Sequence, residues 1–199
     1  PISHEALLER GEAETLRWRG PALMLFARIA CAVLAQGLVA AIFLLRGSPT
    51  PWRDTEPWLP VYGTLIDAGC LALLWRLTRR EGMRVLDLAR FDRRRLVPDL
   101  LLGLALIPVS LVFIFAGTFA GGWLVYGAPS PPHFFGLLPW PAALYGVLVW
   151  PFLWGLTEQM TYNGYLLPRF QVLGRNTGLA IAIVTFVWAA QHAFMPWIF

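Results

Sequence analysis

Charged residues are scarce in this sequence. They make up 14% of its 199 residues, whereas hydrophobic residues make up 57%. A typical soluble domain carries about 25% charged residues, so this composition excludes an ordinary water-soluble protein. Lysine is absent altogether, and all sixteen basic residues are arginine.

Cysteine is also scarce. Cys31 and Cys70 both lie within apolar stretches, and no CxxC or Cys/His spacing accompanies them. This absence excludes a disulfide framework and a cysteine-based metal site as readings of the sequence. We expect both residues to act as small packing side chains.

Strand-like alternation of apolar and polar residues is missing as well. Long apolar runs are present instead, and helices are the expected structures for crossing a membrane. We therefore predict an all-α fold, a polytopic bundle of about five transmembrane helices. The predicted spans are residues 21–45, 59–75, 97–126, 137–167 and 177–199.

The domain organisation follows from these spans. Residues 1–20 form an amphipathic N-terminal segment that we expect at the membrane surface, with a solvated helix or a disordered tail as equal alternatives. Residues 21–199 form the transmembrane domain, which we expect to be C-terminally incomplete, with further spans beyond residue 199. The segment 79–95 is either an interfacial helix or an ordinary connecting loop.

The arginines are distributed unequally between the two sides of the predicted spans. Only Arg46 and Arg53 fall on one side. Thirteen fall on the other: Arg10, Arg17, Arg19, Arg76, Arg79, Arg80, Arg84, Arg90, Arg93, Arg94, Arg95, Arg169 and Arg175. This asymmetry predicts a cytoplasmic N-terminus in a bacterial inner membrane, with membrane lipids as partners. Because the arginines lie between apolar runs, they indicate topology and not nucleic-acid binding.

Ionisable residues within spans are costly, so each suggests a function. Arg28 and Asp99 lie near span ends, where we expect them at the interface. Asp67 is deeper, and we expect it to pair with Arg28 or with a polar group of a neighbouring helix. Glu158 and His192 remain as candidates for chemistry.

Glu158 begins a polar stretch in the fourth predicted span. On an α-helix it shares one face with Thr161, Tyr162 and Tyr165. Gln159 and Asn163 form a second polar row beside it, and their spacing predicts a hydrogen bond between them. The fourth span therefore carries a polar face.

His192 lies in the fifth predicted span, with Trp188 one turn before it. The connection at residues 168–176 is short, so the two helices should be antiparallel neighbours. At 1.5 Å per residue, Glu158 is about 14 Å from the end of its helix and His192 about 22 Å from the start of the next. The two side chains meet only if the helices are offset or tilted.

Both stretches resemble a known family. Residues 158–168, Glu-Gln-Met-Thr-Tyr-Asn-Gly-Tyr-Leu-Leu-Pro, resemble the first motif of the CAAX-protease and bacteriocin-processing (CPBP, or Abi) intramembrane proteases, Glu-Glu-x-x-x-Arg, commonly followed by Gly-Tyr-Leu-Leu-Pro. Residues 188–192, Trp-Ala-Ala-Gln-His, resemble the second motif, Phe-x-x-x-His, at the expected separation. A weaker likeness covers residues 81–88. The third motif, His-x-x-x-Asn, would lie beyond residue 199.

The resemblance implies an intramembrane endopeptidase, a hydrolase acting on a membrane-associated peptide or protein. In that family the motif Glu and His are thought to activate a water, which carries over to Glu158 and His192. The implied supporting residues are Gln159, Asn163, Tyr162 and Trp188. Zinc or another divalent metal is left open as a cofactor; Glu158 and His192 would be its ligands, but two are too few for a closed zinc site.

The sequence departs from the family at two motif positions. Gln159 stands where the family has a second Glu, and Asn163 stands where it has Arg. A neutral amide pair thus replaces a probable ion pair. This favours an alternative in which the chain is a catalytically inactive binding, immunity or scaffold protein. A transporter using Asp67, Glu158 and His192 is a third class, but no inverted repeat is evident.

Overall fold

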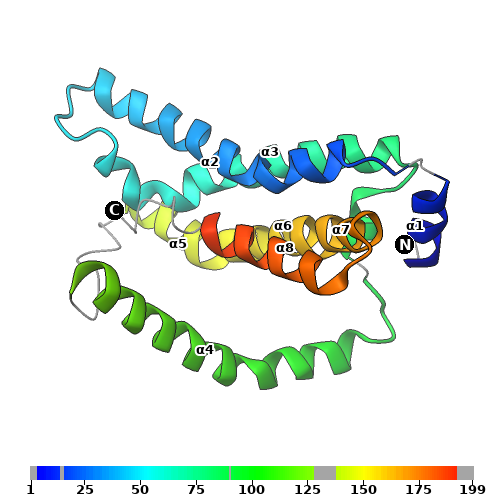
Figure 1. Ribbon diagram of the computed structural model, residues 1–199. Helices are drawn as coiled ribbons and strands as arrows, with labels where there is room; N and C mark the ends of the chain where they lie inside the picture. Colours follow the sequence, from blue (N-terminus) through cyan, green and yellow to red (C-terminus); the bar gives the residue numbers. More distant parts are fainter. Residues whose placement is uncertain (1–3, 14–15, 90, 128–137, 192–199) are drawn as a thin grey trace. The chain divides into compact units, whose positions relative to one another are not determined.

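The structure is a computed structural model that describes residues 4–13, 16–89, 91–127 and 138–191. Within these residues all regular structure is helical, as the sequence predicted (Figure 1). The chain divides into two compact units. One comprises residues 1–90 and 135–199, and the other comprises residues 91–134.

Two long helices form the framework of the first unit. Helix α2 spans Arg19–Leu45 and packs along α3, which spans Leu59–Arg80 and directly follows the 3₁₀ helix η1, Arg53–Trp58 (Figure 1). At 1.5 Å per residue, α2 is about 40 Å long and α3 about 33 Å. Both are apolar and long enough to cross a membrane, which agrees with the first two predicted spans.

The fourth predicted span is not one continuous helix. It comprises α5 (Trp140–Leu148), α6 (Trp150–Glu158), the π-helix η3 (Gln159–Leu166) and α7 (Leu167–Gly174). Pro141, Pro151 and Pro168 each occupy one of the first two positions of a helix. Proline has no N–H to donate to the preceding turn, so a helix restarts easily at such a position.

The predicted loop at residues 168–176 is wrong, because α7 continues to Gly174. Only Arg175 and Asn176 connect it to α8, Thr177–Gln191. Arg175 has a left-handed backbone with φ of 49°, and Asn176 Oδ1 accepts a hydrogen bond from the Leu179 N–H at 2.9 Å. The remainder of the fifth predicted span, residues 192–199, lies outside the described residues.

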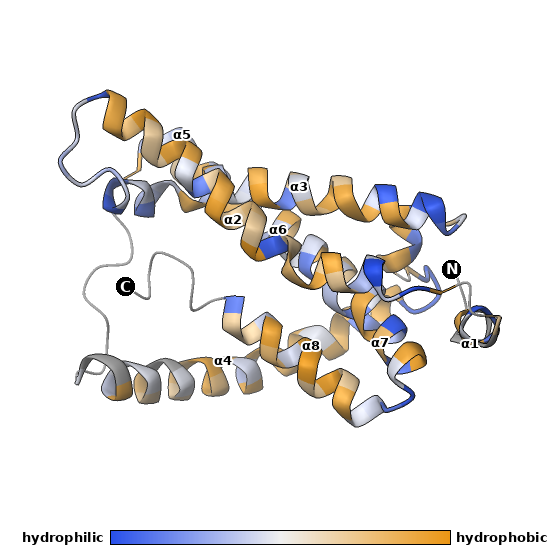
Figure 2. Ribbon diagram, turned by 45° about the horizontal axis from the view of Figure 1, so that its top comes forward, coloured by the Kyte–Doolittle hydropathy of each residue, from blue (hydrophilic) through white to orange (hydrophobic). Residues whose placement is uncertain are grey.

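The core of the first unit lies between α2, α3 and η3. Its most deeply buried side chains include Met24, Tyr62, Ile66, Cys70, Leu74, Tyr165 and Leu166. Cys70 is thus a packing residue, as predicted. Many exposed side chains are apolar too, among them Leu34, Leu45, Phe152 and Phe186. Figure 2 shows hydrophobic residues along much of the helical ribbon. Soluble proteins rarely expose so much apolar surface, which fits a lipid environment.

The N-terminal segment packs on protein. Helix α1, His4–Glu12, buries Leu7 against Leu16 and Val172, so it contacts α7. One face of α1 thus packs on protein, and the expected position of residues 1–20 at the membrane surface stays a prediction. The segment after α3 forms no long interfacial helix, but only the short 3₁₀ helix η2, Val85–Ala89, which packs against η3.

The second unit contains α4, Leu96–Tyr126, which ends at Gly127 in the left-handed conformation. Its bounds nearly coincide with the third predicted span, and it is apolar and long enough to cross a membrane. Asp99 pairs with Arg95 at 3.3 Å, and both side chains are more than half exposed. Asp99 is therefore accessible near the helix end, as expected.

Candidate active site

Glu158 is the last residue of α6, and its carboxylate is held by α8. Trp188 Nε1 donates to Oε2 at 3.1 Å, and Gln191 Nε2 donates to Oε1 at 2.9 Å. Only 8% of Glu158 is exposed. These bonds join the predicted acid to the helix that carries the second motif. His192 directly follows Gln191 and lies outside the described residues.

The extended helix α7 explains how these positions meet. Because the helical stretch runs on to Gly174, Glu158 lies about 24 Å from the link at 1.5 Å per residue, and Gln191 lies about 21 Å from the start of α8. The two levels therefore nearly match. The sequence had predicted a larger difference between the two distances, about 14 Å against about 22 Å, because the helix of Glu158 was expected to end near Pro168.

Arg28 lies beside this carboxylate, and its predicted place at the membrane interface is wrong. Its Nη1 donates to Asp67 Oδ1 at 2.8 Å, which confirms the expected pairing of Asp67 with Arg28. Its Nε lies 3.3 Å from Glu158 Oε1, an ion-pair contact without hydrogen-bond geometry. Arg28 is 2% exposed and Asp67 0%. With two buried carboxylates as partners, the guanidinium has no need to snorkel to the headgroups.

The cluster of Arg28, Asp67 and Glu158 holds two acidic groups and one basic group. When both carboxylates are ionised, its formal charge is negative. Asp67 Oδ2 also has no hydrogen-bond partner among the described residues. A buried charge of this kind is costly unless it is balanced. The single guanidinium of Arg28 therefore has to balance two buried carboxylates.

Tyr162 fixes the orientation of Gln191. Its hydroxyl donates to Gln191 Oε1 at 2.6 Å, which leaves Nε2 turned toward Glu158. The ring of Tyr162 also lies against Trp188, with 6.0 Å between the ring centroids. Gln191 was not among the site residues predicted from the sequence. Its signal was a polar amide next to His192 in an otherwise apolar run.

Gln159 and Asn163 lie on the exposed side of η3. Asn163 Nδ2 donates to Gln159 Oε1 at 2.6 Å, which confirms the predicted bond. By contrast, Thr161, Tyr162 and Tyr165 are buried. The amide pair therefore lies on a different face from the polar residues of the core, and it makes no direct bond to Glu158 among the described residues.

The metal site predicted at Glu158 and His192 stays a prediction, because His192 lies outside the described residues. Each of the Glu158 oxygens accepts an N–H donor, and Arg28 lies between this carboxylate and Asp67. Nowhere among the described residues do three or more His, Cys, Asp and Glu side chains gather. One N–H donor on each oxygen leaves further lone pairs of the carboxylate unused, so these hydrogen bonds neither require nor exclude a metal.

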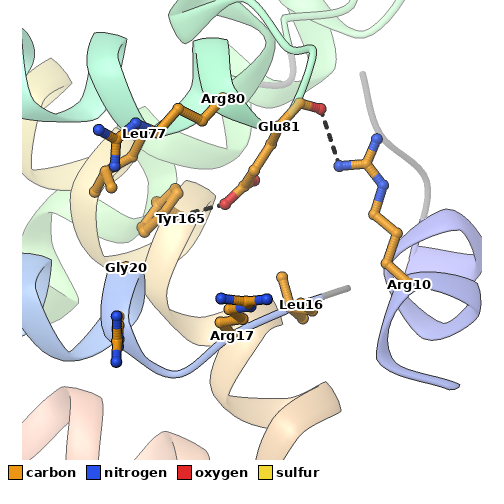
Figure 3. A pocket seen from close by; sticks show the side chains of 9 residues that line it. Arg10, Leu16, Arg17, Gly20, Leu77, Arg80, Glu81 and Tyr165 are labelled. Carbon is orange, nitrogen blue, oxygen red and sulfur yellow. Dashed lines mark hydrogen bonds between the residues drawn. The ribbon is translucent and has the colours of Figure 1, made fainter. Parts of the chain in front are cut away.

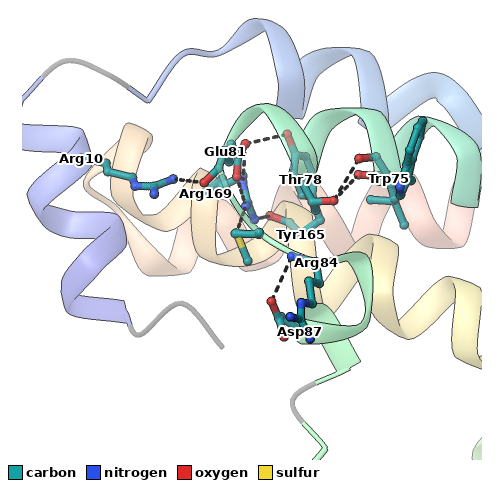
Figure 4. Close-up of polar contacts among 10 residues, drawn as sticks. Arg10, Trp75, Thr78, Glu81, Arg84, Asp87, Tyr165 and Arg169 are labelled. Atoms are coloured by element: carbon teal, nitrogen blue, oxygen red, sulfur yellow. Dashed lines mark hydrogen bonds and ion pairs between the residues drawn. The ribbon is translucent and has the colours of Figure 1, made fainter.

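The segment with the weaker family likeness, residues 81–88, packs against the first motif (Figure 4). The Glu81 carboxylate forms an ion pair with buried Arg169 and accepts a hydrogen bond from Tyr165 OH at 3.1 Å. At the other end of the segment, a Cβ added to Gly164 would lie 2.5 Å from the backbone oxygen of Leu88. The motif glycine therefore permits a close approach of two backbones.

Comparison with known proteins adds no identification. No family model, curated protein or solved structure matches the chain. The family resemblance therefore rests on the motifs at residues 158–168 and 188–192 alone.

Proposed function

We propose that the chain belongs to an intramembrane endopeptidase of the CPBP type that cleaves a membrane-associated peptide or protein. One observation carries this proposal: Glu158 is buried, and its carboxylate accepts hydrogen bonds from two side chains of α8, Trp188 and Gln191. Gln191 is the residue directly before His192. A positioned carboxylate in a site of low dielectric is a competent general base. The supporting arrangement joins residues from both motifs.

In the proposed reaction, Glu158 takes a proton from a water molecule while the water oxygen attacks the carbonyl carbon of the peptide bond. The proton then passes to the leaving nitrogen, so the products are a carboxylic acid and an amine, and Glu158 is regenerated. Trp188 and Gln191 hold the carboxylate in one orientation. His192 orients the water or stabilises the developing negative charge.

The proposed setting is a bacterial inner membrane crossed about five times, with a cytoplasmic N-terminus. The arginine asymmetry of the sequence supports this orientation. Helices α2, α3 and α4 account for three of these spans by length and composition. The remaining two would be formed by the broken helix α5 to α7 and by α8.

Replacement of Glu158 tests the proposal. Glu158→Gln preserves the shape of the side chain but removes the base, so kcat for cleavage of membrane-anchored peptides should fall about a hundredfold or more. The matched control is Glu9→Gln, which removes an exposed carboxylate of α1 and should cleave at the wild-type rate. Assays use the detergent-purified full chain, with Tm measured for each variant. Undiminished cleavage by folded Glu158→Gln would contradict the proposal.

A second candidate function is a catalytically inactive binding or scaffold protein. The observation that favours it is the neutral amide pair of Gln159 and Asn163, whose hydrogen bond stands where the family motif has charged residues. In that case the wild-type chain cleaves none of the peptides, while Glu158→Gln still lowers Tm because Arg28 loses a charged partner. Cleavage by the wild type that depends on Glu158 would exclude this candidate.

A further inference from the structure

A pocket of about 580 Å³ lies where α2 begins and α3 ends (Figure 3). Arginine is the commonest residue of its lining. The lining residues are Arg10, Arg17, Arg19 and Arg80 together with Leu16, Gly20, Leu77, Glu81 and Tyr165. The pocket thus combines a strongly basic wall with a small apolar part.

The one acidic residue in the lining is already neutralised. The Glu81 carboxylate is paired with buried Arg169 and accepts the hydroxyl of Tyr165. Arg10 Nη1 donates to the backbone oxygen of Glu81 at 2.9 Å, which ties α1 to this end of α3. Glu81 therefore helps to build the pocket but does not balance the arginines around it.

The other three arginines leave a positive charge to be matched. Arg17, Arg19 and Arg80 are exposed, and among the residues that the structure describes they form no ion pair. Guanidinium groups gathered around one cavity repel each other unless an anion lies between them. Their arrangement around one cavity therefore favours a negatively charged ligand.

The position of the pocket indicates which class of anion can reach it. It lies at the ends of two helices that are long and apolar enough to cross a membrane, which is the level of lipid headgroups. The first turn of α2 has no acidic residue and no side-chain cap, so the positive end of its dipole adds to the field.

We propose that this pocket binds a phosphate group, carried by a lipid headgroup of the adjoining leaflet or by a soluble phosphorylated compound. Phosphate offers several oxygens to planar guanidinium forks, which favour bidentate binding. Leu16 and Leu77 would contact the carbon atoms next to the phosphate. The proposal does not depend on peptidase activity, because none of these residues contacts Glu158 among the described residues.

The test compares two double variants of the purified full chain in neutral detergent. Arg17→Gln/Arg80→Gln removes two arginines of the pocket. Arg93→Gln/Arg94→Gln removes two exposed arginines elsewhere and changes the net charge equally. Binding of dioctanoyl phosphatidic acid, dioctanoyl phosphatidylcholine and glycerol 3-phosphate is measured by thermophoresis, and Tm is measured for each protein.

We expect the pocket variant to bind phosphatidic acid about tenfold more weakly or worse, because two charge-assisted hydrogen bonds are lost. The control variant should stay within about twofold of the wild type. Phosphatidic acid binding without glycerol 3-phosphate binding identifies a lipid headgroup, whereas equal binding of the two identifies a soluble phosphorylated ligand. The proposal is overturned if the pocket variant binds like the wild type, if the control weakens equally, or if neither phosphatidic acid nor glycerol 3-phosphate binds.

The substituted arginines are exposed, so both variants should fold. If the pocket variant nevertheless loses Tm, the single variant Arg80→Glu provides the second measurement. It places a carboxylate at the pocket and should abolish phosphatidic acid binding through repulsion. Wild-type affinity of folded Arg80→Glu would also overturn the proposal.

Discussion

Arg28 is the residue on which the charge balance of the bundle core depends. It contacts Asp67 of α3 and Glu158 of α6 from its place in α2, and all three side chains are almost fully buried. Removing the arginine leaves two neighbouring carboxylates without a counter-charge. Removing Asp67 leaves one acid and one base, which balance each other. The two changes should therefore differ strongly in their effect on stability.

We predict that Arg28→Met lowers the free energy of unfolding by about 3–5 kcal/mol, because it leaves buried charges uncompensated. Asp67→Asn should cost less, about 1–2 kcal/mol, because the amide oxygen can still accept from Arg28. Chemical unfolding in detergent, followed by tryptophan fluorescence, gives both values. A loss for Asp67→Asn as large as that for Arg28→Met would show that the charge balance is not the cause.

Part of this cluster was predictable from sequence. An aspartate deep in an apolar run needs a partner, and Arg28 was the available cation, so the pairing with Asp67 was expected and is confirmed. The contact between Arg28 and Glu158 was not predictable, because it depends on how helices distant in sequence pack. The role of His192 stays a prediction, since that residue lies outside the described part of the chain.

At the scale of elements, the π-helix η3 is the most unusual feature. π-helices are rare and frequently occur at functional sites. Here η3 joins Glu158 to α7 and carries Tyr162 and Tyr165 into the core. It also packs against η2, and the backbone oxygen of Leu88 lies close to Gly164. The fit between η2 and η3 therefore depends on the absence of a side chain at one position.

We predict that Gly164→Ala lowers the free energy of unfolding by about 1–3 kcal/mol, because the new Cβ would lie 2.5 Å from a backbone oxygen that cannot rotate away. Gly155→Ala is the control, since nothing lies within 4 Å of a Cβ at this position of α6. It should stabilise the helix by about 0.5–1 kcal/mol. Tm shifts of the same sign for both variants would contradict the packing argument.

The interruption and the π-helix in the fourth predicted span show what hydropathy does not reveal. The apolar run predicted a membrane span, but apolarity alone does not show where the helix is interrupted or where its hydrogen-bonding pattern changes. Pro141, Pro151 and Pro168 were visible in the sequence and stand at the starts of α5, α6 and α7. Only Pro151 follows an interruption within the span, at Val149, because α6, η3 and α7 run on without a gap. Nothing in the sequence specified the π-helix.

At the scale of the whole molecule, the arginine pattern leads to a test of topology. The connection between α2 and α3 contains Thr50, and the segment after α3 contains Arg84. These exposed positions lie at opposite ends of one apolar helix. If α3 crosses the membrane in the predicted orientation, Thr50 faces the outside of the inner membrane and Arg84 faces the cytoplasm.

We predict that Thr50→Cys reacts with a membrane-impermeant maleimide in intact spheroplasts, whereas Arg84→Cys reacts only after permeabilisation. Both are placed in a chain in which Cys31 and Cys70 are replaced by alanine, and that parent chain serves as the unlabelled control. The reverse pattern would show the opposite orientation. Labelling of both positions in intact spheroplasts would show that α3 does not cross the membrane.

The two-residue link between α7 and α8 makes the candidate site sensitive to small rotations. With so short a connection, α8 can move away from α7 only by rotating about Arg175 and Asn176. Gln191 lies about 21 Å from the start of α8, so a rotation of about 5° displaces it by about 2 Å. Such a displacement is enough to break its hydrogen bond to Glu158. A thinner bilayer changes the tilt of helices that cross it. A slight change of this kind in α8 would thus alter the hydrogen bonding of the Glu158 carboxylate on the neighbouring helix.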